Sequence, residues 1–211
     1  MSELLSIRRD GAAAARSGLE RCTGAGGVAV FPADGLYGLA CDPLNALAIA
    51  RIHAIKGRDE HKPSAVMYFS PLAMRELVES LGPRTREAVG ALLPGPVTLV
   101  VANPGRRYPL ACGDDPGRLG VRLIEGPLSG AMCPAFQTSA NPSGAQSPHR
   151  FADLSKEILA AADLAIDGGE LTGAPSTVVD ISRIEEGGYW EVLREGGMPA
   201  EELESALAGL V

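Results

Sequence analysis

The 211-residue chain has few aromatic residues, few histidines and few cysteines. Phe, Trp and Tyr together make up 4% of the residues, and there are three histidines and four cysteines. Cys22, Cys41, Cys112 and Cys133 show no Cys-x-x-Cys spacing, and no histidine stands near them in the spacing of a zinc site. We therefore expect reduced, partly buried thiols in a cytoplasmic protein, and we predict no metal-ligating residues.

Long apolar runs and targeting signals are also missing. No run approaches the ~20 apolar residues that a membrane-spanning helix needs. The N-terminal stretch MSELLSIRRDG carries charges where a signal peptide has its apolar segment. These absences predict a chain that is neither secreted nor associated with a membrane.

Three common catalytic or nucleotide-binding motifs do not occur. The sequence has no Gly-x-Ser-x-Gly nucleophile elbow. It also has no Gly-x-x-x-x-Gly-Lys-Ser/Thr phosphate loop and no Gly-x-Gly-x-x-Gly turn. A serine hydrolase of that type, a phosphate-loop enzyme and a dinucleotide-binding protein therefore receive no support.

Net positive charge is absent as well, because the formal net charge is −7. Non-specific binding to nucleic acids depends on neutralising phosphates, so the whole chain is expected to contact RNA or tRNA only weakly and in a salt-dependent way. A local basic patch remains compatible with this charge.

Hydrophobic residues make up 45% of the chain and charged residues 21%, which predicts a buried core. Short apolar runs alternate with helix-forming segments, a pattern typical of an α/β fold in which helices pack on a mixed sheet. We predict a single domain over residues 1–211. Helices are expected at 11–23, 46–55, 71–80, 84–93, 127–133, 151–161 and 199–209. Strands are expected at 28–31, 64–69, 97–101, 119–123, 136–140, 163–166, 176–181 and 189–195, with the last two paired as a hairpin.

Cationic and hydroxyl side chains stand at the ends of several expected elements. Taken singly, Lys56 and Arg58 are explained as a solvated helix end, and Ser139 and Asn141 as turn residues. Arg122 is different, because an arginine inside an apolar strand needs a charged partner or a ligand if it is buried. Other candidates of this kind are Lys62, Arg118, Ser147, Ser176 and Arg194. Several such donors on one face would suit a polyanion such as a nucleoside triphosphate.

Residues 28–58, VAVFPADGLYGLACDPLNALAIARIHAIKGR, resemble the YrdC-like family. That family begins with a strand, a Pro-Thr-x-Thr-Val-Tyr-Gly-Leu loop, a helix and Lys-x-Arg. Later blocks agree in order: PGPVTLVV at 94–101, GVRL at 120–123, TSANPSG at 138–144, DGG at 167–169, STVVD at 176–180 and LREG at 193–196. Each block alone is weak, but the series is specific and covers roughly residues 5–195. The chain resembles the short, single-domain form of the family.

The resemblance implies a twisted, open sheet with a concave, cationic cavity. It also implies an activity, L-threonylcarbamoyladenylate synthesis from L-threonine, bicarbonate and ATP with Mg²⁺. Pyrophosphate is released, and the product passes to proteins that modify a tRNA adenosine. The implied catalytic residues are Lys56, Arg58, Ser139 and Asn141. The implied ATP-binding residues are Arg58, Lys62, Arg118, Ser139, Asn141, Ser147 and Arg194. The implied threonine-binding residues are Gly35, Tyr37, Arg122 and Ser176.

The sequence departs from the family pattern on the amino-acid side. Ala33 and Gly35 replace the two loop threonines, and Met67 stands where histidine is frequent. An apolar pocket discriminates less well than one that hydrogen-bonds a substrate hydroxyl. We therefore expect looser selection of threonine against serine and valine, and tighter selection once threonine is restored at 33 and 35.

Two other functions remain open at this point. The lost threonines favour a paralogue with an altered amino-acid substrate, whereas the intact Lys-x-Arg and Ser-x-Asn pairs favour the synthase. A concave surface could also take double-stranded RNA or tRNA, although the net charge argues against strong binding.

Overall fold

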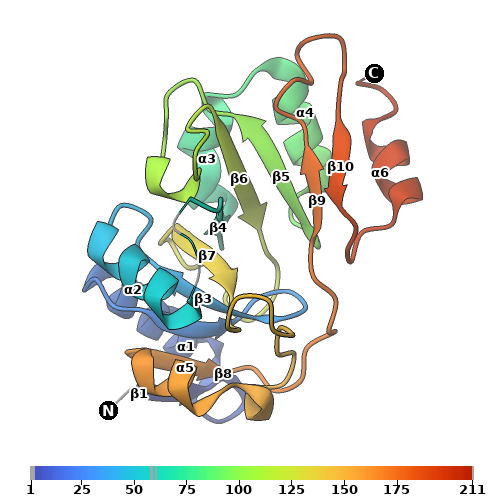
Figure 1. Ribbon diagram of the computed structural model, residues 1–211. Helices are drawn as coiled ribbons and strands as arrows, with labels where there is room; N and C mark the ends of the chain where they lie inside the picture. Colours follow the sequence, from blue (N-terminus) through green and yellow to red (C-terminus); the bar gives the residue numbers. More distant parts are fainter. Residues whose placement is uncertain (1–2, 58, 60, 211) are drawn as a thin grey trace.

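The structure, a computed structural model, describes residues 3–57, 59 and 61–210 (Figure 1). Its strands form one sheet in the order β1-β8-β2-β3-β7-β4-β6-β5-β9-β10. The strands are β1 (Glu3–Ser6), β2 (Ala29–Pro32), β3 (Tyr37–Cys41), β4 (Ala65–Tyr68), β5 (Val97–Ala102), β6 (Arg118–Leu123), β7 (Ala135–Ser139), β8 (Leu164–Asp167), β9 (Thr177–Asp180) and β10 (Glu191–Arg194). The α-helices are α1 (Ile7–Gly24), α2 (Ala46–Lys56), α3 (Pro71–Glu79), α4 (Pro83–Leu92), α5 (Lys156–Ala161) and α6 (Ala200–Leu207).

Strand pairing confirms the predicted mixed sheet. The pairs β1–β8, β2–β8, β4–β6 and β5–β9 are parallel. The remaining neighbours are antiparallel, including the predicted hairpin of β9 and β10. The sheet runs from β1 near the N-terminus to β10 near the C-terminus, at opposite ends of the molecule (Figure 1).

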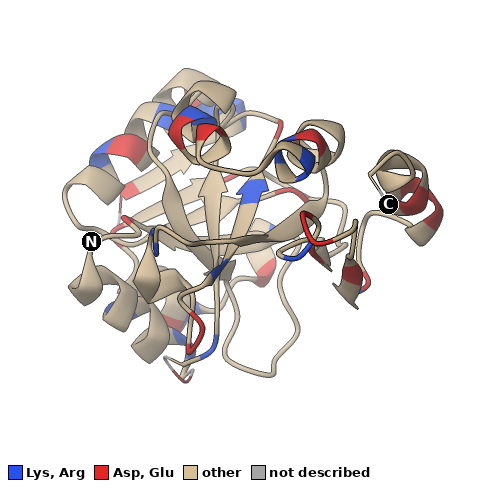
Figure 2. Ribbon diagram, turned by 90° about the horizontal axis from the view of Figure 1, so that it is seen from above, with Lys and Arg blue, Asp and Glu red and all other residues tan. Residues whose placement is uncertain are grey.

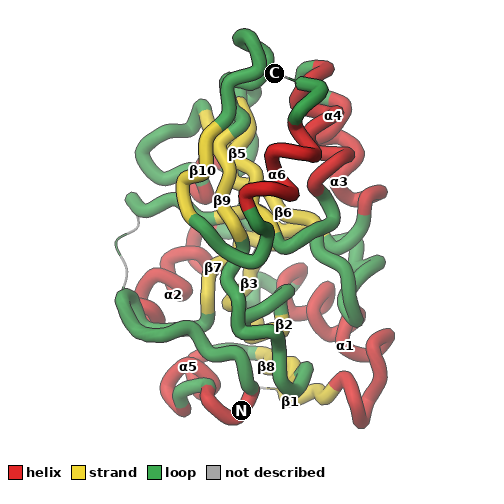
Figure 3. The backbone as a smooth tube through the Cα atoms, turned by 90° about the vertical axis from the view of Figure 1, so that its right-hand side faces the viewer, coloured by secondary structure: helices red, strands yellow, loops and turns green. Residues whose placement is uncertain are grey.

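The two faces of the sheet are covered unequally. One face carries a large apolar cluster to which α2, α3, α4, α5 and α6 contribute residues. The other face is covered by α1 only near β1, β8, β2 and β3. Figure 3 shows α1 beside β1 and β8, and α3, α4 and α6 together beside the opposite end of the sheet. Residues 124–131 also pack on this second face, against Met67 and Ala135. Other positions on the second face of the strands from β7 to β10 line a cavity.

Local sequence signals account for several helix ends. Asn45 begins α2 as predicted, because its side chain accepts a hydrogen bond from the backbone N–H of Ala48 at 3.0 Å. Ser70 and Ser155 cap α3 and α5 in the same way. Charged residues lie mainly on the helices and loops, and most of the sheet is uncharged (Figure 2).

Four sequence-based expectations about secondary structure are wrong. The stretch expected to be a loop between residues 32 and 45 contains β3, a fully buried strand in the middle of the sheet. The chain also forms β1 ahead of α1, where no strand was expected. Residues 127–133 form turns rather than a helix, and the helix expected over 151–161 divides into a 3₁₀ turn at Phe151–Asp153 and α5.

All four cysteines are free, as expected, and Cys41 and Cys112 are buried. Burial raises the pKa of the Cys41 thiol to about 12, so this thiol is unreactive at neutral pH. In the described part of the chain, no helix has the length and apolar character to cross a membrane.

Candidate active site

A cavity of about 550 Å³ lies on the face of the sheet that α1 leaves uncovered. Its wall comes from the β2–β3 turn, from β5, β6, β7, β9 and β10, and from the loops around residues 61–65, 112–115 and 174–176. Its volume falls within the range of pockets that hold small ligands. Among the predicted site residues, the wall includes Gly35, Tyr37, Arg118, Arg122, Ser139, Ser147, Ser176 and Arg194.

The period of two along each strand decides which side chains reach this cavity. On β6, Leu119 and Val121 belong to the helix-covered core, whereas Arg118, Gly120 and Arg122 line the cavity. On β5, Thr98 and Val100 face the cavity and alternate with core residues in the same way. The polar positions of otherwise apolar strands thus gather on one face.

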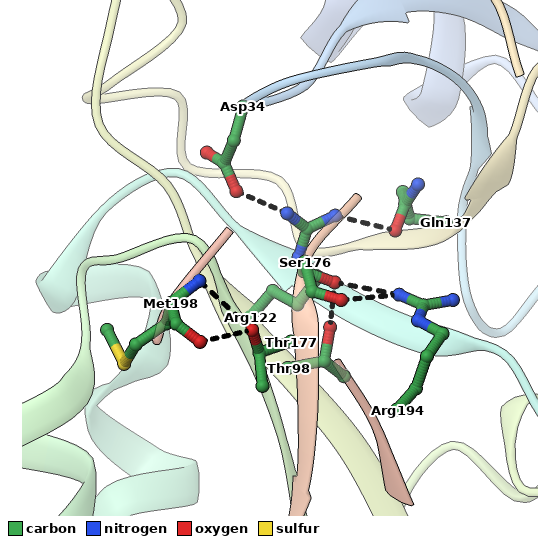
Figure 4. Close-up of polar contacts among 8 residues, drawn as sticks. All are labelled: Asp34, Thr98, Arg122, Gln137, Ser176, Thr177, Arg194 and Met198. Carbon is green, nitrogen blue, oxygen red and sulfur yellow. Dashed lines mark hydrogen bonds and ion pairs between the residues drawn. The ribbon is translucent and has the colours of Figure 1, made fainter. Parts of the chain in front are cut away.

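Arg122 is the most deeply placed cation of the cavity, with 6% of the residue exposed. Its Nη2 donates to Oδ2 of Asp34, and its Nη1 donates to Oε1 of Gln137 at 3.3 Å (Figure 4). Its Nε has no hydrogen-bond partner among the described residues. The expectation of a charged partner is confirmed, and the partner is Asp34.

Burial dominates the electrostatics of this ion pair. It raises the pKa of the Asp34 carboxyl, while the charge of Arg122 acts in the opposite direction. It also lowers the pKa of the Arg122 guanidinium, which the charge of Asp34 opposes. Each group is costly in this position without an opposite charge, so their contact stabilises both.

Arg194 and Ser176 form a second polar group beside Arg122 (Figure 4). The Nη2 of Arg194 donates to the carbonyl oxygen of Ser176 at 2.7 Å and to its hydroxyl at 3.2 Å. The same hydroxyl lies 2.8 Å from Oγ1 of Thr98. Within the described residues, no carboxylate forms an ion pair with Arg194, so its charge is available to an anionic ligand.

The described wall carries three arginines and three aspartates. The aspartates are Asp34, Asp114 and Asp115, and Arg118 is paired with Asp180 at the edge of the cavity. The arginines and aspartates of the wall are thus equal in number. The cationic cavity that the resemblance implies would need further cations, such as Lys62, that do not line the wall, so it stays a prediction.

Lys56 lies beneath the cavity wall, where only 4% of the residue is exposed. The expectation of an exposed helix end is wrong. Its Nζ donates to the carbonyl oxygens of Ser139 and, at 2.7 Å, Asn141. It also lies 3.3 Å from Oδ1 of Asn141, which accepts from the Ser147 hydroxyl at 3.3 Å. Lys56 therefore fixes the Ser139–Asn141 turn. This turn carries Ser139, and its Asn141 holds the hydroxyl of Ser147; both serines line the cavity.

The β2–β3 turn is closed by a facing loop. The carbonyl oxygen of Gly35 accepts from the backbone N–H of Gly173 at 2.9 Å. A Cβ at position 35 would lie 2.0 Å from the carbonyl oxygen of Ala174. The expectation that threonine could simply be restored at position 35 is therefore wrong, because the facing backbone occupies that space.

Tyr37 contributes to the cavity wall, but its hydroxyl is engaged elsewhere. It donates to the carbonyl oxygen of Gly169 at 2.8 Å and accepts from the backbone N–H of Gly168 at 2.9 Å. Burial raises the pKa of this phenol to about 12, so it stays protonated. Met67 is fully buried on β4 in register with Arg122, which places this departure from the family pattern next to the deepest cation of the cavity.

The structure brings most of the predicted site together, but not all of it. Lys56 and Asn141 support the wall without lining it, and Lys62 is exposed and not part of the wall. Arg58 lies outside the described residues. Sequence reasoning missed Asp34, Gln137 and Thr98, each a polar residue of the wall. For Thr98, its position between two apolar residues of a strand was a signal that could have identified it.

The part of the chain that the structure describes contains no group of three or more histidine, cysteine, aspartate or glutamate side chains suited to a metal ion. Asp114 and Asp115 nevertheless place two carboxylates on the cavity wall. Mg²⁺ is commonly held by one or two carboxylates together with substrate phosphates, so this donor set fits a metal ion that enters with a nucleotide.

Comparison with known proteins gives consistent matches. Residues 22–196 match the family model Sua5_yciO_yrdC, described as Telomere recombination. A protein of Thiobacillus denitrificans named threonylcarbamoyl-AMP synthase is 32% identical over 174 residues, which cover 80% of this chain and 92% of that protein.

Two solved structures share the fold. The crystal structure of P. abyssi Sua5 complexed with L-threonine superimposes with a TM-score of 0.82 at 25% identity. It covers 98% of this chain, and the chain spans 60% of that protein. The structure of E. coli YciO has a TM-score of 0.79 at 21% identity and covers 96% of this chain and 100% of that one.

Proposed function

The chain belongs to the Sua5/YciO/YrdC family, and on that premise we propose that it is a threonylcarbamoyl-AMP synthase. Such an enzyme, a nucleotidyltransferase, joins L-threonine, bicarbonate and ATP and releases pyrophosphate. The observation that carries the proposal is the single cavity wall that unites the buried Arg122 with Arg194, Ser176 and the Ser139 turn. These residues come from distant blocks of the sequence, and all of them suit anionic substrates.

The part of the cavity around the buried Arg122 suits the amino acid. Arg122 and Ser176 offer a guanidinium and a hydroxyl to the carboxylate of threonine, and Met67 lies in register beside Arg122. Because Ala33 and Gly35 bring no hydroxyl to the pocket, threonine is held mainly through its carboxylate in this proposal.

The remaining polar residues of the same wall suit the nucleotide. Arg118, Arg194, Ser139 and Ser147 provide two cations and two hydroxyls along one wall. Lys56 acts indirectly, because it holds the carbonyls of Ser139 and Asn141 and so fixes the turn that presents these hydroxyls. Lys62 and Arg58 remain proposed contacts on the nucleotide side.

The chemistry requires positioning and charge neutralisation. The amine nitrogen of threonine bonds to the carbon of carbon dioxide derived from bicarbonate and loses a proton, which gives a carbamate. A carbamate oxygen then attacks the α-phosphorus of ATP, and the bond to pyrophosphate breaks. Both reactants are anions, so oriented arginine and hydroxyl donors lower the barrier without a covalent protein intermediate. Mg²⁺ that enters with ATP would neutralise charge on the phosphates, and Asp114 and Asp115 could hold it.

We also propose that the product passes to proteins that modify tRNA, and that the reaction takes place in the cytoplasm. Direct contact of this chain with free tRNA is proposed to be weak, because its net charge is −7.

Pyrophosphate release tests the proposed function. It should require L-threonine and bicarbonate together. Ser176→Ala, which removes a hydroxyl from the cavity, should raise the KM for threonine about tenfold, the size of one lost hydrogen bond. Ser143→Ala is the matched control, because Ser143 is exposed in the same loop as Ser147 and is not part of the wall. Release of pyrophosphate without threonine would refute the proposal.

A further inference from the structure

Asp34 and Arg122 form an ion pair across the cavity between segments that are not neighbours in the sheet. Asp34 lies in the turn that joins β2 and β3, and Arg122 lies on β6. Two strands, β7 and β4, separate β3 from β6. The Asp34 carboxylate points directly at the guanidinium of Arg122 (Figure 4).

This contact leaves part of the guanidinium unused. Only Nη2 of Arg122 donates to Asp34, and Nη1 makes a bond of 3.3 Å to Gln137. Its Nε is buried and has no hydrogen-bond partner among the described residues. Arginine can bind a carboxylate through two parallel N–H···O bonds, and that arrangement is stronger than a single bond. A free carboxylate could therefore bind Arg122 more fully than Asp34 does.

The position of Asp34 allows it to leave. Its side chain is 20% exposed, whereas the side chain of Arg122 is 8% exposed. It lies between Ala33 and Gly35, in a turn that the backbone closes through a hydrogen bond from Ala33 N–H to the Leu36 carbonyl. The fold of this turn therefore does not depend on where the carboxylate points.

We propose that Asp34 is an internal competitor for the carboxylate of the amino-acid substrate. It neutralises the buried Arg122 in the free protein, and it moves off the guanidinium when a substrate carboxylate binds there. This inference rests on the proposed function, because it assigns Arg122 to the substrate carboxylate. Its consequence is an apparent affinity that is reduced by the small fraction of molecules in which Arg122 is free.

Binding measurements without ATP test this proposal. Two ligands are compared by isothermal titration calorimetry: L-threonine and 3-hydroxybutyrate, which is threonine without its amino group. Asp34→Asn should bind both ligands on the order of tenfold more tightly than the native protein, because the competing charge is gone. Asp153→Asn is the matched control, since it removes a carboxylate that pairs with an arginine, Arg150, away from the cavity wall. It should leave both affinities within about twofold of native.

Three outcomes would overturn the proposal. The first is that Asp34→Asn binds neither ligand more tightly than the native protein does. The second is that neither ligand binds to either protein. Weaker binding of threonine with unchanged binding of 3-hydroxybutyrate would instead show that Asp34 holds the substrate ammonium. If Asp34→Asn does not fold, Asp34→Ser replaces it with the same expectation.

The proposed function has a separate readout. Threonine-dependent pyrophosphate release by the native protein fails if the function is wrong, whether or not Asp34→Asn changes the two affinities.

Discussion

Replacement of Lys56 by methionine tests whether the Lys56 ammonium holds the Ser139–Asn141 turn in place or is only a surface charge. Lys56 is buried, and its ammonium donates to the carbonyl oxygens of Ser139 and Asn141. Methionine keeps most of the apolar stem but leaves both carbonyls without this donor. A hydrogen bond to a charged group contributes about 1.5–3 kcal/mol, and relief from burying the ammonium offsets part of the loss. We expect the free energy of unfolding to fall by about 2–4 kcal/mol.

Urea unfolding followed by circular dichroism measures this change. Lys62→Met is the matched control, because Lys62 is exposed and its stability effect should stay within about 0.5 kcal/mol. Pyrophosphate release should fall together with stability in Lys56→Met, since the Ser139 turn loses its support. Native stability in Lys56→Met would refute the reasoning, and loss of activity at native stability would indicate that Lys56 contacts substrate directly.

Three further predictions concern the cavity and its surroundings. Arg194→Lys keeps the charge but loses the planar donor fork, so ATP should bind about tenfold more weakly in calorimetry, and unchanged binding would contradict the assignment. Ala33→Thr should fold normally and raise the ratio of kcat/KM for threonine over serine and valine, whereas Gly35→Thr should lower the thermal midpoint because the facing backbone leaves no room. The backbone N–H of Thr85 holds the pKa of Glu185 below its usual range, so this contribution to stability is complete above that range and disappears as pH falls through the lowered value. Urea midpoints between about pH 6 and about pH 3 should fall less steeply for Glu185→Gln than for the native protein.

Most of the helices and the hairpin could be predicted because their signals are local. Asn45 precedes an apolar helical pattern and caps α2 through its own side chain. The strand β3 could not be identified in this way. It is central in the sheet and buried on both faces, so Tyr37–Cys41 shows no alternation of polar and apolar residues.

In the candidate site too, some features could be predicted from the sequence and others could not. Arg122 was identified because a cation in an apolar strand is unusual wherever that strand is placed. The burial of Lys56 could not be foreseen, since its partners Ser139 and Asn141 lie more than eighty residues away. Asp34 was also missed as a partner, because only the order of strands in the sheet brings the β2–β3 turn opposite β6.

The central claim is that this cavity joins threonine, bicarbonate and ATP into one adenylate. The most direct measurement is mass spectrometry of the product formed from ¹³C-bicarbonate, L-threonine and ATP. Our account predicts a threonylcarbamoyl adenylate that carries one ¹³C atom and appears with an equal amount of pyrophosphate. An adenylate without the label, or pyrophosphate release with no such product, would contradict it.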